Sequence, residues 1–418
     1  MKTIIIRQLL ATILLALTCT TTLAASLKIG LNYPQTGRYS DQGLQQRLGA
    51  FLAVDEINKA GGVMGQPIEL VIRNTAGEPE RGARNTAELI DRERVNMVFG
   101  GVSSAVAIAS GKAARERDRL YFGTLTYSNA TTGEEGHSHM FREPYNAWMT
   151  AKVLSQYLKT HHGDDEYFYI TSDYTWGWSV EESVRRFTNT DDKTTHGGVT
   201  TPFPRALITD FRQALEQAEA SGAKVLMMVL FGDDMVRAIN VAYEMGLTRK
   251  MQIVVPNLTL GMARQVGPTI MEGVIGGSPW VWNLPFEFNY PRGRAFVEAF
   301  SSRYEMRPST AAASAYSIVY QYKEAVERAG TTNTRAVTRA LENHRYSFLK
   351  DEQVWRAFDH QNVQTVYVVK VRPRSDVVAD EYSSNFFEII DAMPGDEAAQ
   401  TDAEWKLRRE QAGKPLAL

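Results

Sequence analysis

Short apolar segments alternate with amphipathic segments along most of the chain. The apolar segments are four to six residues long, as is typical of buried strands, and they lie at Leu27–Leu31, Ile68–Arg73, Asn96–Phe99, Leu120–Gly123, Tyr167–Thr171, Val225–Leu230, Gln252–Val255 and Gly273–Gly277. Between them, apolar residues recur at helical spacing, as where Met235, Ile239 and Ala242 share one face. This alternation predicts an α/β fold in which parallel sheets have helices on both faces.

The pattern changes at two places along the chain. A new series of strands and helices begins after Met140–Asn146 and ends around Gly273–Trp282. Three helical stretches and two strand-like segments follow, at roughly 290–304, 310–329, 334–343, Gln353–Ala357 and Thr365–Val371. No low-complexity linker separates the two units, so we expect two domains between which the chain crosses several times.

The first 25 residues have the features of a secretory signal peptide. Lys2 and Arg7 precede an apolar core at Leu9–Leu17, and an A-x-A-like cleavage site ends at Ala24. The core is shorter than the roughly 20 residues that span a bilayer, so we expect cleavage and a periplasmic location. An uncleaved anchor and a lipoprotein acylated at Cys19 are the alternatives.

The composition excludes several kinds of function. The single cysteine lies within the signal, so a cleaved chain cannot form a disulfide, a thiolate metal site or a cysteine nucleophile. Loss of the two cationic signal residues changes the formal net charge from −2 to −4, which gives no electrostatic attraction for nucleic acid or anionic lipid. The remaining length of about 390 residues exceeds one comfortable core and favours two domains.

The sequence contains no motif of a catalytic or metal site. His137 and His139, and the neighbours His161 and His162, have no cysteine or H-E-x-x-H arrangement with them, and we expect them at the surface. The sequence also lacks a G-x-S-x-G motif, a P-loop and a complete dinucleotide-binding fingerprint. We therefore expect a binding protein that needs no cofactor or metal, and not an enzyme.

The end of the chain has a different composition. Beyond Pro373 the sequence turns polar and acidic, as in DAMPGDEAAQTDAEWKLRRE. Such a segment offers few apolar side chains to a core. We expect residues 391–418 to form a loosely held polar tail.

A turn rich in glycine and serine follows the third apolar segment. In FGGVSSAVAIASG, two glycines precede Ser103 and Ser104 where a strand gives way to a helix. Ligands bind at the carboxyl ends of strands in open parallel sheets. Glycines allow the backbone to approach a ligand closely, and the free N–H groups of the helix favour an anion such as a carboxylate. The alternative is that one of the serines only caps the helix.

The second unit contains a turn of the same design. In LMMVLFGDDMVRA, a strand is followed by Phe231 and a glycine, and Asp233 and Asp234 enter the helix. Acidic residues are ordinary at helix N-termini, so capping is again the alternative. If the domains close on one another, the two turns would face each other, one attracting a carboxylate and the other offering acceptors to a donor group.

Aromatic residues lie at four of the turns that follow strands, namely at Tyr39, Tyr127, Trp176 and Phe231. The polar residues in turns of this kind are Thr126, Ser128, Asp173 and Asn257. A single aromatic residue in a turn is more often packed within the loop. Four of them indicate a pocket with large apolar walls and few polar groups.

These segments, in this order, resemble the branched-chain amino acid type of periplasmic solute-binding protein that serves ABC importers. The resemblance runs from Ser26 to about Pro373, and its more specific parts are GLNYPQTGRYSDQG, AVDEINKAGGVMGQPIELV, FGGVSSAVAIASG, SDYTWGWSVEESV, ITDFRQALEQAEASGAKVLMM, AYEMGL and FDHQNVQTVYVV. It implies the type I periplasmic binding protein fold: two doubly wound parallel-sheet domains, joined by a three-crossing hinge, that close on a small ligand.

The resemblance, together with the two pattern changes, predicts the extent of each lobe. We expect an N-terminal lobe of residues 26–143 plus 276–355 and a C-terminal lobe of residues 144–275 plus 356–390. Phe141–Pro144 and Gly273–Gly277 are the expected strands of the hinge.

The resemblance also implies roles for the residues of the turns. Ser103, with Ser104 nearby, would bind the ligand carboxylate. Backbone and hydroxyl groups around Thr126, Tyr127 and Ser128 would add polar contacts. The aromatic walls would come from Tyr39, Trp176 and Phe231.

The sequence departs from this family at Asn257. Amino-acid binders of the family carry a glutamate there, which holds the ligand ammonium. An asparagine accepts a hydrogen bond but cannot neutralise a buried cation. Unless Asp173, Asp233 or Asp234 takes the place of the glutamate, an α-amino acid is disfavoured as the ligand, and aromatic acids, amides and urea become alternatives.

The leading hypothesis is a monomeric periplasmic receptor that delivers its ligand to the permease subunits of an ABC importer. The expected ligand is a small carboxylate-bearing solute: an aromatic or branched apolar acid, or a branched-chain amino acid. A receptor of the same fold that binds an amide, urea or another small polar solute and signals to a membrane sensor is an alternative. A secreted hydrolase is a third hypothesis.

Overall fold

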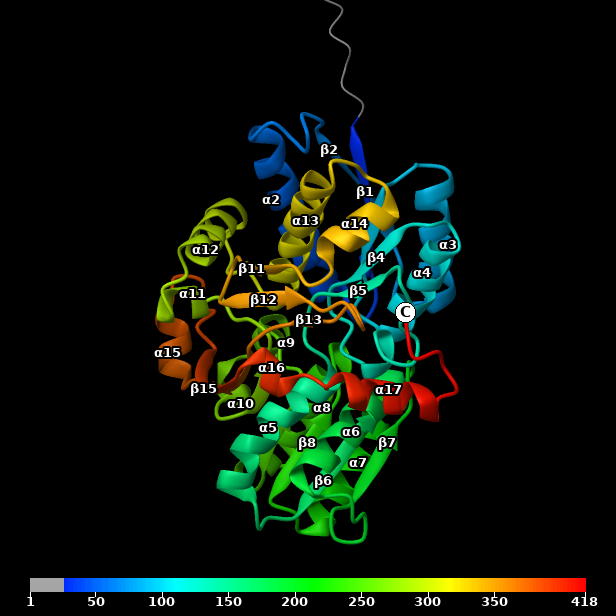
Figure 1. The fold of residues 1–418 in the computed structure, drawn as a ribbon. Helices are drawn as coiled ribbons and strands as arrows, with labels where there is room; N and C mark the ends of the chain where they lie inside the picture. The colour runs from blue at the N-terminus through cyan, green and yellow to red at the C-terminus, as the bar shows by residue number, and fades with distance from the viewer. Residues whose placement is uncertain (1–25) are drawn as a thin grey trace, which may run out of the picture.

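The computed structural model describes residues 26–418, which form two lobes, each built around its own β-sheet (Figure 1). The sheet of the N-lobe has the strand order β2-β1-β3-β4-β5, with every neighbouring pair parallel. Its strands are β1 (Leu27–Tyr33), β2 (Ile68–Asn74), β3 (Met97–Gly100), β4 (Leu120–Gly123) and β5 (Met140–Arg142). Strands β3 and β4 are buried along their whole length, which explains their continuous apolar sequences.

Helices cover both faces of this sheet. They are α2 (Ser40–Lys59), α3 (Pro79–Asp91), α4 (Ser104–Arg115), α11 (Leu284–Glu287), α12 (Pro291–Tyr304), α13 (Thr310–Ala329) and α14 (Thr334–Leu341). Helix α2 packs along α13, and α3 packs along α4. Phe99 belongs to the large apolar core that contains α2 and α13, whereas Val98 belongs to a separate small core with α3 and α4. Neighbouring residues of one strand therefore serve opposite faces, as the pleat requires.

The sheet of the C-lobe has the strand order β15-β14-β10-β9-β8-β6-β7. These strands are β6 (Tyr167–Ser172), β7 (Gly198–Thr201), β8 (Val225–Val229), β9 (Gln252–Val255), β10 (Ile275–Ser278), β14 (Val366–Val371) and β15 (Phe387–Met393). The strands from β10 to β7 pair in parallel, whereas β14 and β15 run antiparallel to their neighbours. The sheet is therefore mixed at one edge, a common feature of large α/β sheets.

The helices of the C-lobe are α5 (Ala147–His162), α6 (Thr175–Thr188), α7 (Ile208–Ser221), α8 (Asp233–Glu244), α9 (Leu260–Val266), α10 (Pro268–Met271) and α15 (Arg374–Ala379). Helix α5 packs against α6, and α7 packs against α8, which in turn contacts α9. Short 3₁₀ helices lie in each lobe, η1 (Asn129–Thr131) in the N-lobe and η2 (Leu247–Arg249) in the C-lobe. The predicted α/β class is confirmed. The eight apolar segments predicted as strands correspond to β1, β2, β3, β4, β6, β8, β9 and β10, whereas β7 and β15 were not predicted.

The chain crosses between the two sheets after β5, after β10 and before β14. A small antiparallel sheet of β11 (Arg345–Ser347), β12 (Glu352–Trp355) and β13 (Asn362–Val363) precedes the third crossing. Two expected lobe boundaries need correction. The second crossing starts after Ser278 and not at residue 276, because β10 pairs with β9 and β14. The C-lobe resumes at Val366 and not at residue 356, because β12 and β13 pair with each other.

The expectation of a loose tail over residues 391–418 is wrong. Strand β15 ends at Met393 and is followed by the helices α16 (Gly395–Ala398) and α17 (Asp402–Gln411). Trp405 and Arg409 are buried, and they lie four residues apart, on one face of α17. A segment can therefore be polar on average and still dock firmly, because a single aromatic residue and a charged neighbour carry the contact.

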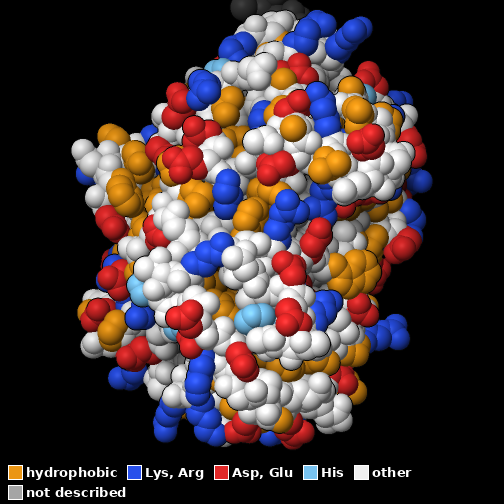
Figure 2. Space-filling view, turned by 60° about the horizontal axis from the view of Figure 1, so that its bottom comes forward, with side chains coloured by type: hydrophobic (Ala, Val, Ile, Leu, Met, Phe, Trp, Pro, Cys, Tyr) orange, Lys and Arg blue, Asp and Glu red, His pale blue; other side chains and the backbone are white. Residues whose placement is uncertain are grey.

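The predicted signal peptide, residues 1–25, lies outside the described residues. Within residues 26–418, no helix is both long enough and apolar enough to span a membrane. On the face shown in Figure 2, acidic and basic side chains are interspersed and neither sign forms an extended patch.

Candidate functional site

The glycine and serine turn connects β3 to α4 at the carboxyl end of the N-lobe sheet. Gly100 and Gly101 have φ angles of 130° and 81°, which are left-handed values that favour glycine. A Cβ atom on Gly100 would lie 2.3 Å from the carbonyl oxygen of Asn32 on the neighbouring strand β1. The two glycines therefore let the chain turn tightly into the helix.

The two serines of this turn have different surroundings. Ser103 is the N-cap residue of α4, yet its side chain makes no capping hydrogen bond. The Oγ of Ser104 accepts a hydrogen bond of 3.1 Å from the backbone N–H of Ser128, in the next turn of the same sheet. Ser104 thus ties two turns together, and the buried hydroxyl of Ser103 is not used to cap the helix.

The four aromatic residues that the sequence singled out converge. The ring of Phe231, from the C-lobe, lies 6.0 Å from that of Tyr39 and 6.0 Å from that of Tyr127, both from the N-lobe. The ring of Trp176 lies 5.8 Å from Phe231 on the C-lobe side. All four side chains are buried. Aromatic residues from turns of both lobes thus form one interlobe cluster.

Two further tyrosines join this cluster, although they were not among the predicted site residues. The hydroxyl of Tyr174 lies 3.3 Å from that of Tyr39, across the two lobes. The ring of Tyr145 lies 5.1 Å from that of Tyr127. Tyr174 precedes α6 in the aromatic-rich segment DYTWGW. Tyr145 lies in the first crossing, where the sequence alone offers no signal for it.

Asn257 is buried and hydrogen-bonded within the C-lobe and the hinge. Its Oδ1 accepts a hydrogen bond of 3.1 Å from the indole N–H of Trp176. Its Nδ2 donates one of 3.0 Å to the hydroxyl of Tyr145, which in turn donates to the carbonyl oxygen of Gly277 at 2.9 Å. The side chain of Asn257 therefore fixes the orientation of the Trp176 ring.

Of the three aspartates considered as ammonium ligands, Asp234 is paired, Asp173 is exposed and Asp233 is half-buried. Asp234 forms an ion pair of 2.6 Å with Arg38 of the N-lobe, and burial raises the pKa of its carboxyl while Arg38 opposes that rise. Burial likewise raises the pKa of Asp233, which is less enclosed. Asp173 is exposed and accepts a hydrogen bond of 2.9 Å from the indole of Trp178. The structure thus does not bring Asp173 into the cluster.

Arg142 holds the turn that contains Thr126 and Ser128. Its Nη1 donates to the carbonyl oxygens of both residues, and its Nε donates to Oε1 of Gln361 at 2.6 Å. Burial lowers the pKa of the Arg142 guanidinium to about 9. The hydroxyl of Thr126 is buried and has no hydrogen-bond partner in the described part of the chain. It is therefore a candidate for contact with a ligand.

Gln42 is another candidate that the sequence did not reveal. Its side chain is buried, and neither its amide nitrogen nor its amide oxygen has a partner within residues 26–418. Gln42 lies one turn before Gln46 on the same face of α2. Gln46 donates a hydrogen bond of 3.0 Å to the carbonyl oxygen of Gly101. Polar residues at this spacing on an otherwise apolar face of α2 are the signal that could have identified it.

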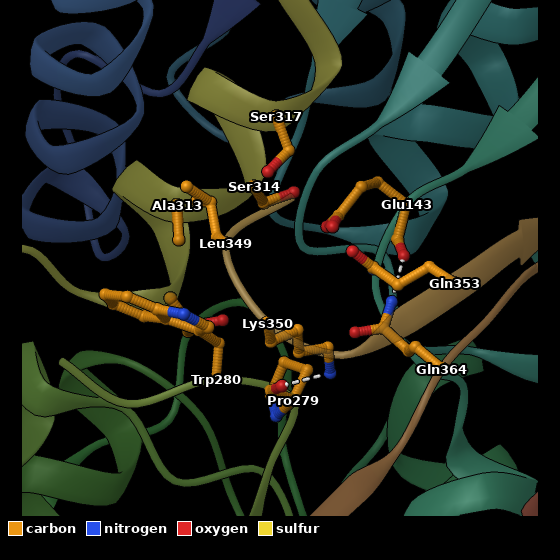
Figure 3. A pocket seen from close by; sticks show the side chains of 11 residues that line it. Glu143, Pro279, Trp280, Ala313, Ser314, Ser317, Leu349, Lys350, Gln353 and Gln364 are labelled. Atoms are coloured by element: carbon orange, nitrogen blue, oxygen red, sulfur yellow. Dashed lines mark hydrogen bonds between the residues drawn. The ribbon is translucent and has the colours of Figure 1, made fainter. Parts of the chain in front are cut away.

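A cavity of about 20 Å³ lies where the three crossings meet (Figure 3). Lys350 donates hydrogen bonds to the carbonyl oxygens of Pro279, at 2.7 Å, and Thr365, at 2.8 Å, and thereby links the second and third crossings. Burial lowers the pKa of Lys350 to about 8 and raises that of Glu143. The cavity is large enough for one water molecule. None of the predicted ligand-binding residues lines it, so it belongs to the hinge and not to the candidate site.

The expectation of surface positions is wrong for one histidine. His137 is buried, and burial together with nearby cations lowers the pKa of its imidazole to about 3. The sequence did not reveal this because the ring lies against Gly111 of α4, a contact that the spacing along the chain does not indicate. Within residues 26–418, no group of three or more His, Cys, Asp and Glu side chains is placed to hold a metal ion.

The sequence and the fold both match known proteins. The family model described as "Periplasmic binding protein" matches residues 26–376. A Leu/Ile/Val-binding protein of Rhizobium johnstonii is 28% identical over 195 residues, which are 47% of this chain and 51% of that protein. The chain thus spans about half the length of this relative. A Leu/Ile/Val-binding protein homologue of Brucella melitensis is 25% identical over 394 residues, which are 90% of this chain and 91% of that protein.

Solved structures share the fold along almost the whole chain. A periplasmic binding protein from Burkholderia mallei superposes with a TM-score of 0.81 at 24% identity, covering 91% of this chain and 97% of that one. A branched-chain amino acid transporter substrate-binding protein from Streptococcus pneumoniae, in complex with isoleucine, has a TM-score of 0.74 at 20% identity, covering 88% and 100%.

A solute-binding protein from Rhodopseudomonas palustris, in complex with 3,4-dihydroxybenzoic acid, has a TM-score of 0.75 at 17% identity and covers 88% of this chain and 98% of that one. These relatives and structural neighbours are solute-binding proteins and not enzymes. The chain has two sheets joined by three crossings, with an aromatic cluster between them. Together with the family match over residues 26–376, these features show that the chain belongs to the periplasmic binding protein family.

Proposed function

We propose that this protein captures a small carboxylate-bearing solute between its two lobes and delivers it to the permease subunits of an ABC importer. The observation that carries the proposal is the interlobe cluster, in which aromatic residues from turns of both sheets meet. Tyr127 of this cluster precedes Ser128, whose backbone N–H donates to Ser104 at the start of α4. Such a site encloses an apolar body and offers N–H groups to an anion. Two structural neighbours hold isoleucine and 3,4-dihydroxybenzoic acid, both carboxylates.

The charges around the cluster favour a ligand without an ammonium group. Asp234 is paired with Arg38, and both polar atoms of the Asn257 side chain are hydrogen-bonded. Burial of an ammonium group without a charged partner costs on the order of several kcal/mol. An aromatic or branched apolar acid is therefore the favoured ligand, and a branched-chain amino acid comes second.

The location and partners follow from the same proposal. The signal-like features of residues 1–25 support export to the periplasm, and the family supports docking to an inner-membrane permease. The ligand would enter between open lobes, and closure would present both lobes to the permease. We expect the receptor to act as a monomer.

The ligand class can be tested with a thermal-shift panel on protein that has been unfolded and refolded to remove any ligand. We would compare leucine, 4-methylpentanoate, benzoate, benzamide and urea. A ligand at 100 times its Kd adds about 2.7 kcal/mol to the stability. We expect the two acids to raise the unfolding temperature most. A shift by urea or benzamide alone would instead support an amide or urea receptor.

Ser103→Ala tests whether this hydroxyl binds the carboxylate of the ligand. Replacing Ser103 by Ala should weaken binding of the acid by roughly 1.5–3 kcal/mol if the hydroxyl donates to the carboxylate. The stability of the ligand-free variant should stay that of the wild type, because Ser103 does not cap α4. A loss of stability without a loss of affinity would assign Ser103 a purely structural role.

A further inference from the structure

The last residues of the chain cross between the lobes a fourth time. Strand β15 belongs to the C-lobe sheet, and α16 packs on α5 of the same lobe. The backbone then reaches α17, which lies against the loop of residues 132–136 in the N-lobe. In Figure 1, α17 is the red helix that runs across the front of the molecule between the two lobes. We name residues 394–418 the C-terminal strap.

The strap is anchored to the N-lobe by buried groups of α17. The indole of Trp405, which is 1% exposed, donates a hydrogen bond of 2.9 Å to the carbonyl oxygen of Thr132. The guanidinium of Arg409 donates to the carbonyl oxygens of Gly133 at 2.6 Å and Gly136 at 3.1 Å. Partial undocking of α17 would break the hydrogen bonds of a buried cation to backbone carbonyls, and leaving such a charge without partners is costly. Helix α17 therefore moves with the N-lobe.

The other end of the strap is held by the C-lobe and the hinge. Lys152 of α5 donates a hydrogen bond to the carbonyl oxygen of Glu397. Arg356, between β12 and β13, donates one of 2.6 Å to the carbonyl oxygen of Gln400. Only the residues from Ala399 to Thr401 connect α16 on the C-lobe to α17 on the N-lobe, and the backbone of Gln400 among them is held by Arg356.

One side chain of the strap joins both lobes directly. Arg408 forms an ion pair of 3.1 Å with Glu134 of the N-lobe and one of 3.0 Å with Glu182 on α6 of the C-lobe. The guanidinium lies between two carboxylates that belong to different bodies. Separation of Glu134 from Glu182 must therefore break one of the two pairs.

We infer that the C-terminal strap limits how far the two lobes can separate in the ligand-free protein. The three crossings of the hinge permit rotation of one lobe against the other, and the strap adds a fourth connection with an anchor on each side. The match to the family model ends at residue 376, before the strap begins. The limit on opening therefore rests on residues that the family model does not match.

The test measures the distance between the lobes without any ligand, so it does not depend on the proposed function. The described residues contain no cysteine, which permits spin labels at two introduced positions. Glu116→Cys on the N-lobe and Glu244→Cys on the C-lobe are exposed sites. Double electron–electron resonance then gives the distribution of interlobe distances in the wild-type background and in strap variants.

Two variants release the strap in different ways. The double variant Trp405→Ala, Arg408→Gln removes the indole anchor on the N-lobe and the interlobe ion pairs, and it leaves the Arg409 anchor in place. A chain that ends at Ala399 lacks α17 altogether. The matched control is Leu407→Ala, because this side chain is 54% exposed on the same helix.

We expect a longer mean interlobe distance and a broader distribution in both strap variants, and a wild-type distribution in Leu407→Ala. Hydrogen exchange of α17 in the double variant shows whether the strap has been released. If α17 exchanges freely, or is absent, and the distance distribution still equals that of the wild type, the proposal is overturned. The truncated chain and the double variant are independent, so failure of one to fold leaves the other to decide.

Discussion

Trp176, a proposed wall of the ligand site, has a ring orientation that is fixed by a neutral side chain. Its ring faces Phe231 within the interlobe cluster, and its indole N–H is bound by Asn257. This hydrogen bond fixes the ring before any ligand binds. Binding then does not have to order the side chain, which would cost conformational entropy. At the proposed ligand site, Asn257 would thus act through Trp176 as well as through its lack of charge.

Replacement of Trp176 by Ala should weaken ligand binding strongly. Truncation of a buried aromatic residue at a binding site often costs more than about 2 kcal/mol, or roughly thirtyfold in Kd. Calorimetric titration with the tightest ligand of the panel measures the effect. Trp178→Ala is the control, because the ring of Trp178 is 55% exposed. Equal ligand affinities of the two variants would show that Trp176 only packs within the protein and does not contact the ligand.

A change of Asn257 to Asp should alter which ligand is preferred. Aspartate is close in shape to asparagine and keeps an acceptor for the indole of Trp176. Its second oxygen can accept from the hydroxyl of Tyr145 only if that hydroxyl gives up its hydrogen bond to the carbonyl oxygen of Gly277. The added charge should favour leucine relative to 4-methylpentanoate in competition titrations. If the wild type already prefers leucine by a large factor, the argument for a neutral ligand end fails.

At the scale of single residues, the sequence predicted which residues lie close together better than it predicted their hydrogen bonds and exposure. Tyr39, Tyr127, Trp176 and Phe231 could be grouped because each follows a strand at the same end of a sheet. The partners of Asn257 and the exposure of Asp173 could not be predicted. They depend on side-chain directions in loops, for which spacing along the chain gives no rule.

At the scale of elements, the turn between β3 and α4 imposes a requirement that can be measured. Gly100→Ala should destabilise the protein by about 3 kcal/mol or more, because the new Cβ would meet a fixed backbone oxygen and the φ angle is unfavourable. Urea unfolding of the ligand-free protein measures this loss.

Gly222 offers the matched control for this substitution. It also has a positive φ, of 73°, but a Cβ there would meet nothing within 4 Å. Gly222→Ala should therefore cost only about 1 kcal/mol. Equal losses for the two glycines would show that backbone conformation alone, and not the close approach to Asn32, decides the cost.

The strands were predictable and the C-terminal elements were not. Strands such as β4 and β9 are buried between helices, so their apolar runs are unbroken in the sequence. Only the two end residues of β15, Phe387 and Met393, are buried, and α17 is held by few buried side chains. Their average composition is that of a solvated segment, which is why the prediction of a loose tail was wrong.

At the scale of the whole molecule, the lobes touch through groups that opening would separate. Arg38 and Asp234 pair between the lobes, and Tyr39 meets Phe231 and Tyr174. We expect small-angle scattering to show a smaller radius of gyration with saturating ligand than without it, since hinge closure would bring these groups together. Identical scattering curves would contradict closure on the ligand.

The packing of α2 against α13 also bears on how the chain matures. Helix α2 ends at Lys59 and α13 begins at Thr310, with the entire C-lobe sheet up to β10 encoded between them. The first core therefore cannot be completed until nearly 80% of the polypeptide has been synthesised, and such long-range contacts slow folding. The N-lobe of a newly made chain would thus stay incomplete during most of its synthesis. If the chain is exported as proposed, this lobe would remain able to thread through a narrow translocation pore for that time.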